Sequence, residues 1–164
     1  MKQIFKRLHT TFNVLFAVQV IFCAVALAFA RESAQPAAII VRYTGPEFHP
    51  QLLSKAGILA LVFLLSVIGV TFMMDRQRRA QGAIFQSLMA KVNHYRQTSI
   101  IRLVMIVAAN LLAMVLVMRE NNMVYFALVA IGLLFFLRFR PTSGKFIRSY
   151  QLSPAETKEV TSEK

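Results

Sequence analysis

The chain has 164 residues and is 57% hydrophobic, which exceeds the roughly 45 to 50% apolar content of ordinary soluble domains. This composition indicates one membrane domain and excludes an ordinary soluble fold. A formal charge of +12 would favour a nucleic-acid partner in a soluble chain. Here the 19 Lys and Arg lie in short segments beside apolar stretches. We therefore interpret them as topology signals and headgroup contacts, and expect no nucleic-acid partner.

Four long apolar stretches follow one another along the chain. A helix rises about 1.5 Å per residue, so about 20 residues cross a hydrocarbon core of roughly 30 Å. The first stretch is uncharged and is interrupted only by Asn13 and Gln19, and the second ends at Asp75. A brief polar turn separates the third and fourth, which predicts an antiparallel hairpin. We expect membrane-spanning helices at about 12–30, 56–74, 101–118 and 123–138.

The stretches are predicted to be helices because lipid offers the backbone no hydrogen-bond partners, so only helices and closed barrels cross it. Barrel strands alternate polar and apolar residues, whereas 111–117 and 131–137 are apolar throughout. The predicted fold class is an all-α membrane protein, with four transmembrane helices arranged as two antiparallel hairpins. Residues 1–152 are expected to form a single domain.

Two segments outside the spans also carry a pattern. Ile84, Leu88, Val92 and Tyr95 recur at three- and four-residue spacing, which predicts an amphipathic cytoplasmic helix at about 78–98. The polar, acidic-rich C-terminus predicts a flexible tail over 153–164.

Lys and Arg are distributed unevenly between the two sides of the predicted spans. Three precede the first span, six lie between the second and third, and six follow the fourth, so fifteen share one side. The other side has only Arg31, Arg42, Lys55 and Arg119. The positive-inside rule therefore predicts that both termini are cytoplasmic. The expected location is the bacterial inner (cytoplasmic) membrane, in which the protein is multi-pass.

The first apolar stretch allows a second interpretation. Basic residues precede it and an Ala-Phe-Ala sequence at 28–30 ends it, as in a cleavable signal peptide. The apolar run is longer than the 7 to 15 residues of a typical signal core, which favours a retained first helix. Cleavage would leave three spans and a cytoplasmic C-terminus.

Few polar residues lie within the predicted spans, and none of them is Asp or Glu. Proton or sodium coupling usually places ionisable side chains at that depth. Asn110 is the deepest strongly polar residue. We interpret it as making an interhelical hydrogen bond, with ligand or ion binding as the alternative. Ser66 and Thr71 are interpreted as packing residues, and the alternative is that they line a pore together with Asn110.

Residues suited to catalysis or metal binding are scattered along the chain. His9, His49 and His94 are separated by loops and spans, and the single cysteine, Cys23, has no partner. Zinc sites use three or four protein ligands. We expect no catalytic residues, no cofactor and no metal site. An enzyme would require His9, His94 and Tyr95 to converge with an acid.

Basic residues cluster directly after the second and fourth spans. Each could attract anionic lipid with about 1 kcal/mol, although topology signalling explains the same residues. The candidate anionic-lipid contacts are Arg76, Arg78, Arg79, Arg138, Arg140, Lys145 and Arg148.

Four short elements lie within the C-terminal 70 residues or so: Tyr95-Arg96, Ile100-Ile101-Arg102, Arg140-Pro141-Thr142, and Leu152-Ser153 with Glu156. In these elements the chain resembles small bacterial four-helix integral membrane proteins of unassigned activity. In that pattern an acidic residue and a glycine follow Ile-Ile-Arg by about one turn, whereas this sequence has Val107 and Ala108. The resemblance implies the four-helix membrane architecture and no particular activity.

Together these features favour a noncatalytic integral membrane protein. We expect an accessory or scaffolding subunit that acts through helix packing and through contacts with anionic lipid, other membrane subunits or a second copy of itself. The alternative is a small oligomeric transporter or channel.

Overall fold

A computed structural model of the chain describes residues 2–32, 55–82, 84–85, 87–120 and 124–162. Every element in these ranges is an α-helix, so the all-α prediction is confirmed for them. The outer segment with His49 lies outside the described residues. The helices are α1 (Lys2–Glu32), α3 (Lys55–Gly82), α4 (Leu88–Glu120), α5 (Tyr125–Arg138), α6 (Ser143–Tyr150) and α7 (Pro154–Ser162).

Three of these helices, α1, α3 and α4, are long and apolar enough to cross a membrane. α5 has 14 residues, and at about 1.5 Å per residue it covers about 21 Å of a core that is roughly 30 Å thick. By the same length and composition, α5 counts as a fourth crossing only when it is taken together with α6, and the two helices are bent by 76° relative to each other. By length and composition, the helices provide three to four crossings.

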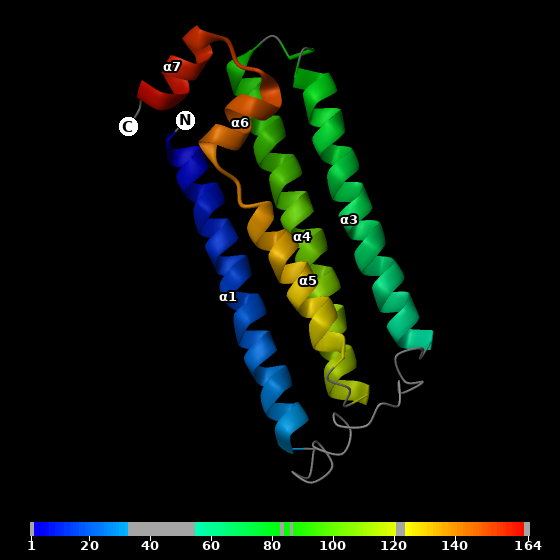
Figure 1. Cartoon of the computed structure of the whole chain (residues 1–164). Helices are drawn as coiled ribbons and strands as arrows, with labels where there is room; N and C mark the ends of the chain where they lie inside the picture. The colour runs from blue at the N-terminus through cyan, green and yellow to red at the C-terminus, as the bar shows by residue number, and fades with distance from the viewer. Residues whose placement is uncertain (1, 33–54, 83, 86, 121–123, 163–164) are drawn as a thin grey trace.

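The four long helices lie side by side, and the chain reverses direction between successive ones (Figure 1). α4 is the central helix, because α1, α3 and α5 all pack on it. α1 and α3 lie on opposite sides of α4 and α5 (Figure 1). The two members of the first expected hairpin, α1 and α3, therefore pack mainly on α4 rather than on each other.

Two apolar clusters fill the interior of the bundle. In the first, Phe12 of α1 stacks on Phe136 of α5 with ring centroids 4.7 Å apart, and both rings belong to a cluster with Leu103 of α4. The second is built around Met114 of α4 and Val129 of α5. Each cluster also includes residues of α3, so all four long helices share one core.

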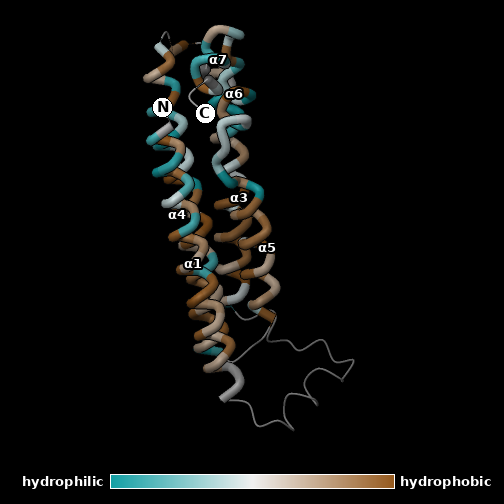
Figure 2. The backbone as a smooth tube through the Cα atoms, turned by 90° about the vertical axis from the view of Figure 1, so that its left-hand side faces the viewer, coloured by the Kyte–Doolittle hydropathy of each residue, from teal (hydrophilic) through white to brown (hydrophobic). Residues whose placement is uncertain are grey.

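The outward faces of the bundle are apolar as well. Leu59 and Met73 of α3 are 68% and 64% exposed, and Leu134 of α5 is 68% exposed. Hydrophobic residues cover most of the length of the four long helices, whereas hydrophilic residues gather at the end that carries α6 and α7 (Figure 2). A contiguous apolar surface of this kind is unusual on a soluble monomer and matches a lipid environment.

One pair of amides interrupts the apolar interior. Asn110 of α4 donates from Nδ2 to Oε1 of Gln19 on α1 over 2.5 Å, and the two residues are 1% and 0% exposed. Gly132 of α5 faces the same amide, because a Cβ at this position would lie 1.7 Å from Asn110 Oδ1. The hydrogen bond joins α4 to α1, and the missing side chain of Gly132 lets α5 approach Asn110 at the same level.

At the hydrophilic end, α3 and α4 extend beyond the predicted spans. The amphipathic helix expected at about 78–98 is divided, since residues 78–82 continue α3 and residues 88–98 begin α4. Val92 and Tyr95 keep the predicted apolar face and pack with Phe146 of α6, whereas Ile84 is 73% exposed. The predicted helix is divided because hydropathy marks only where an apolar run ends. The helices α3 and α4 themselves continue through the polar residues beyond those ends.

A short helix, α7, occupies most of the segment for which a flexible polar tail was expected. Its first turn is closed by a capping box: Ser153 N donates to Glu156 Oε2 over 2.8 Å, and Glu156 N donates to Ser153 Oγ over 3.3 Å. We call the part of the molecule formed by the start of α1, residues 75–98 of α3 and α4, and α6 and α7 the basic end.

Gly132→Ala is expected to lower the thermal unfolding midpoint of the detergent-solubilised protein. The new Cβ must displace Asn110 and break its bond to Gln19, and such bonds contribute roughly 0.5 to 2 kcal/mol in membrane proteins. Gly69→Ala on α3 is the control, since an added methyl there meets nothing within 4 Å. In an Asn110→Ala background the cost of Gly132→Ala should largely disappear. An equal cost in both backgrounds would contradict the contact.

Candidate functional site

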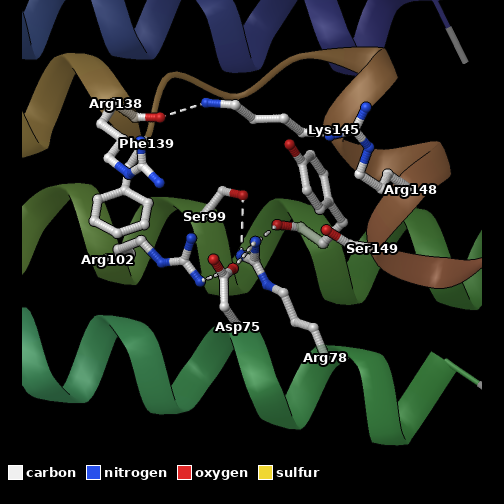
Figure 3. A pocket seen from close by; sticks show the side chains of 10 residues that line it. Asp75, Arg78, Ser99, Arg102, Arg138, Phe139, Lys145, Arg148 and Ser149 are labelled. Carbon is white, nitrogen blue, oxygen red and sulfur yellow. Dashed lines mark hydrogen bonds and ion pairs between the residues drawn. The ribbon is translucent and has the colours of Figure 1, made fainter.

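A cavity of about 260 Å³ lies at the basic end, with walls from α3, α4, the end of α5, and α6 (Figure 3). Five of its side chains are cationic and one is a carboxylate. The lining residues are Asp75, Arg78, Tyr95, Ser99, Arg102, Arg138, Phe139, Lys145, Arg148 and Ser149.

The cavity forms at the level where three apolar runs end. Asp75 is the first charged residue after the apolar run of α3, Arg102 directly precedes that of α4, and Arg138 follows that of α5. Because these helices pack side by side, their boundary residues meet (Figure 3). Tyr95 and Ser99 reach the same cavity, since they lie two turns and one turn before Arg102, respectively, on one face of α4.

α6 adds the remaining basic residues. It begins after Thr142, whose side chain accepts a hydrogen bond from Lys145 N. Phe146 and Tyr150 are buried in an aromatic cluster with Tyr95, with ring centroids of Phe146 and Tyr95 5.2 Å apart. Burial of this apolar side fixes α6 across the end of the bundle, so Lys145 and Arg148 line the cavity.

Lys145 also caps α5. Its Nζ donates to the carbonyl oxygens of Arg138 and of Arg140, the latter over 3.1 Å. The last carbonyls of a helix have no intrahelical donors, and the negative end of the helix dipole favours a cation there. Among the described residues, neither Arg138 nor Arg148 forms an ion pair with a carboxylate.

Arg78 is 3% exposed and is held mainly by neutral groups. Its Nε donates to Thr98 Oγ1 over 2.7 Å and its Nη2 donates to Ser99 Oγ over 3.0 Å. The guanidinium lies 4.9 Å from the centroid of the Tyr95 ring, a favourable cation–π distance. Asp75 Oδ1 is 3.9 Å from Arg78 Nη1, at the limit of an ion pair.

Arg102 is 4% exposed and makes the closer contact with Asp75. Its Nη2 donates to Asp75 Oδ1 over 2.6 Å, and its guanidinium lies 4.6 Å from the centroid of the Phe139 ring. Its buried Nε has no hydrogen-bond partner among the described residues. Two buried guanidiniums therefore share a single carboxylate.

A second polar cluster lies beside the cavity and fixes α7. Lys91 Nζ donates to Glu156 Oε1 over 2.7 Å, and Tyr150 Oη lies 2.5 Å from His94 Nδ1. The hydrogen bond from Lys91, together with that from Ser153 N, holds the pKa of the Glu156 carboxyl below its usual value. The carboxylate that closes the capping box thus also ties α7 to α4.

The structure divides the predicted anionic-lipid contacts into two groups. Arg78, Arg138, Lys145 and Arg148 line the cavity. Arg76 is exposed outside it, and Arg140 contacts His9 at 3.2 Å instead. The side chain of Arg79 lies outside the described residues.

The polar residues of the spans are not brought together. Asn110 bonds to Gln19, Thr71 is buried and donates to Ile68 O over 2.7 Å, and Ser66 is exposed and donates to Val62 O over 2.7 Å. Likewise His9 contacts Arg140 whereas His94 contacts Tyr150. Groups of three or more potential metal-binding residues are absent from the described residues.

Sequence reasoning did not assign Asp75, Ser99 or Arg102 to a site. The spacing of Tyr95, Ser99 and Arg102, which places them on one face of a helix, is a signal that could have indicated their shared surface. No family model, curated protein or solved structure matches this chain.

Acidification is expected to release α7 from α4. Because the folded-state pKa of Glu156 is lowered, its contribution is fully present above about pH 4.5 and is lost as the pH falls through the lowered pKa. Amide hydrogen exchange of residues 154–162 measures this release. Glu156→Gln should lower the protection already at pH 7, because it removes the ion pair with Lys91, whereas Glu159→Gln, an exposed residue one turn on, should leave it intact. Equal protection in the unmodified protein and in both variants would contradict the contact between Lys91 and Glu156.

Proposed function

We propose that this chain is a noncatalytic protein of a bacterial inner membrane, which crosses the bilayer four times and keeps both termini in the cytoplasm. It acts by association, as an accessory or scaffolding subunit that contacts anionic lipid and other membrane subunits. The observation that carries the proposal is the division of the bundle into long apolar faces and one charged end (Figure 2).

Four crossings require α5 to count as a span although it is short. The apolar run of α5 ends at Arg138, whose aliphatic stem can lie along the lipid while its head reaches the headgroups. α6 turns away at 76°, and its apolar side is buried against the ends of α1 and α4 rather than continuing the direction of α5. A slightly thinner bilayer beside α5 makes up the remaining length at modest cost.

The orientation follows from where the cations lie. The start of α1, the connection between α3 and α4, and α6 with α7 are at the same end of the bundle (Figure 1). Fifteen of the 19 Lys and Arg lie in the parts of the sequence before the first predicted span, between the second and third, and after the fourth. The positive-inside rule assigns that end to the cytoplasm.

Retention of α1 is part of the proposal. Leu8, Phe12 and Ala26 of this helix are buried in three different clusters of the bundle, and Gln19 is the partner of Asn110. Cleavage after residue 30 would remove these contacts and expose the amide of Asn110 to lipid, at a cost of a few kcal/mol for an unpaired polar group. The packing supports a retained first helix.

Association is favoured over transport because the polar residues of the spans do not lie together on one face, although Asn110 Oδ1 is buried without a hydrogen-bond partner among the described residues. Asn110 and Thr71 bond to α1 and to their own helix, respectively, and Ser66 is on the outer surface. A common pathway through one chain would need these three residues on one face.

The topology is tested by thiol labelling of intact cells in a Cys23→Ala background. Ser87→Cys, in the connection between α3 and α4, should react with a membrane-impermeant maleimide only after permeabilisation. Lys55→Cys, at the other end of α3, should react in intact cells, because it is exposed and lies on the expected outer side. The reverse pattern would overturn the orientation.

Association is tested by purification in a mild detergent followed by native mass spectrometry. We expect stoichiometric recovery of another membrane subunit or of a second copy. Repeated recovery of a single chain alone, from native expression levels, would count against an accessory role. The Gly132→Ala variant serves as a control for loss of partners through unfolding.

A further inference from the structure

We propose that the cavity at the basic end binds the phosphate group of an anionic lipid headgroup. This inference rests on the proposed function for the depth at which the cavity lies in the membrane. Its chemistry rests on the residues of the cavity alone.

The first argument is charge. Five cationic side chains line the cavity against the single carboxylate of Asp75, and two of them, Arg78 and Arg102, are 3% and 4% exposed. A charge removed from water is costly unless an opposite charge and hydrogen bonds compensate it. Asp75 lies 2.6 Å from Arg102 but 3.9 Å from Arg78, so one carboxylate serves both. An additional anion would restore the balance.

The second argument is an unused donor. Arg102 Nε is buried without a hydrogen-bond partner among the described residues, and a buried unpaired donor is rare in folded proteins. Asp75 and the Phe139 ring occupy other parts of the same guanidinium. Guanidinium groups present donors in a planar fork that matches the oxygens of a phosphate. The free donor therefore points to an oxyanion as the missing ligand.

The size and position of the cavity further restrict which ligand it can hold. The volume of about 260 Å³ is just below the roughly 300 to 1,000 Å³ of cavities that hold drug-sized molecules, so it suits a small group such as a phosphate. Asp75, Arg102 and Arg138 lie where three apolar runs end, which is the level of the headgroups in the proposed topology. Free phosphate has the same oxyanion, but it has no apolar chains to occupy the adjoining faces of the helices.

Four variants of the full-length chain in a neutral detergent distinguish specific binding in the cavity from nonspecific attraction to surface cations. Arg148→Gln removes an exposed cation of the cavity, and Arg76→Gln removes an exposed cation of the same end that does not line it. Arg102→Gln removes the unused donor. Asp75→Asn removes the competing negative charge and keeps a polar side chain of the same shape.

The measurement is binding of short-chain phosphatidylglycerol and phosphatidic acid, by native mass spectrometry and by the shift in unfolding midpoint. Arg148→Gln should weaken binding about fivefold, as expected for one surface cation, and Arg102→Gln tenfold or more, as expected for a hydrogen bond to a charged group. Arg76→Gln should leave it unchanged, and Asp75→Asn should tighten it. Equal effects of Arg148→Gln and Arg76→Gln, or weaker binding in Asp75→Asn with the fold intact, would overturn the site.

Two further ligands identify the source of the phosphate. Short-chain phosphatidylcholine, which is zwitterionic, should not bind. Inorganic phosphate should compete only at much higher concentration than the anionic lipids, whereas tight binding of inorganic phosphate without lipid binding would overturn the headgroup assignment. Failure of all phosphate ligands, in a chain whose labelling pattern matches the proposed topology, would overturn this inference and leave the proposed function standing.

Discussion

In a bilayer there is no hydrophobic driving force between helices, because lipid tails are equally apolar, so helix association depends on close van der Waals packing and on interhelical hydrogen bonds. Here both occur at one point, where Asn110 bonds to Gln19 and packs against Gly132. Asn110 lies eight residues after Arg102 on α4, about 12 Å, and Gly132 lies six residues before Arg138 on α5, about 9 Å. The amide pair thus lies about two helical turns from the level at which the boundary charges meet.

The central position of α4 explains why these charges are buried. An arginine at the end of a peripheral helix reaches the headgroups by extending its side chain. Arg102 lies 14 residues inside α4, which is flanked by α3 and by α5, so its guanidinium is enclosed between them. Asp75 from α3 and the Phe139 ring after α5 are the groups that these neighbours supply. The cavity is therefore a consequence of helix order as much as of composition.

The all-helical class and the approximate apolar runs were predictable, because each depends on local composition. The division of 78–98 between two helices was not, since hydropathy falls at the membrane boundary while backbone hydrogen bonding continues past it. Ser153 and Glu156 have the spacing of a capping box, which predicts the start of α7, but the polar composition favoured a flexible tail. Asp75 and Arg102 are 27 residues apart and look like separate topology signals, so their contact, and with it the cavity, depends on tertiary packing.

The same geometry gives a bound headgroup a structural effect. The cations of the cavity come from α3, α4, α5 and α6 and meet only in the folded bundle, so a ligand that bridges them stabilises the folded state by mass action. In the proposed topology the cavity lies at the leaflet in which anionic lipid is abundant, so the proposed site would be occupied whenever the protein is in its membrane. Occupancy that does not vary suits a permanent anchor better than a sensor. A headgroup at this level would fix the depth of α4, and with it the position of the basic end.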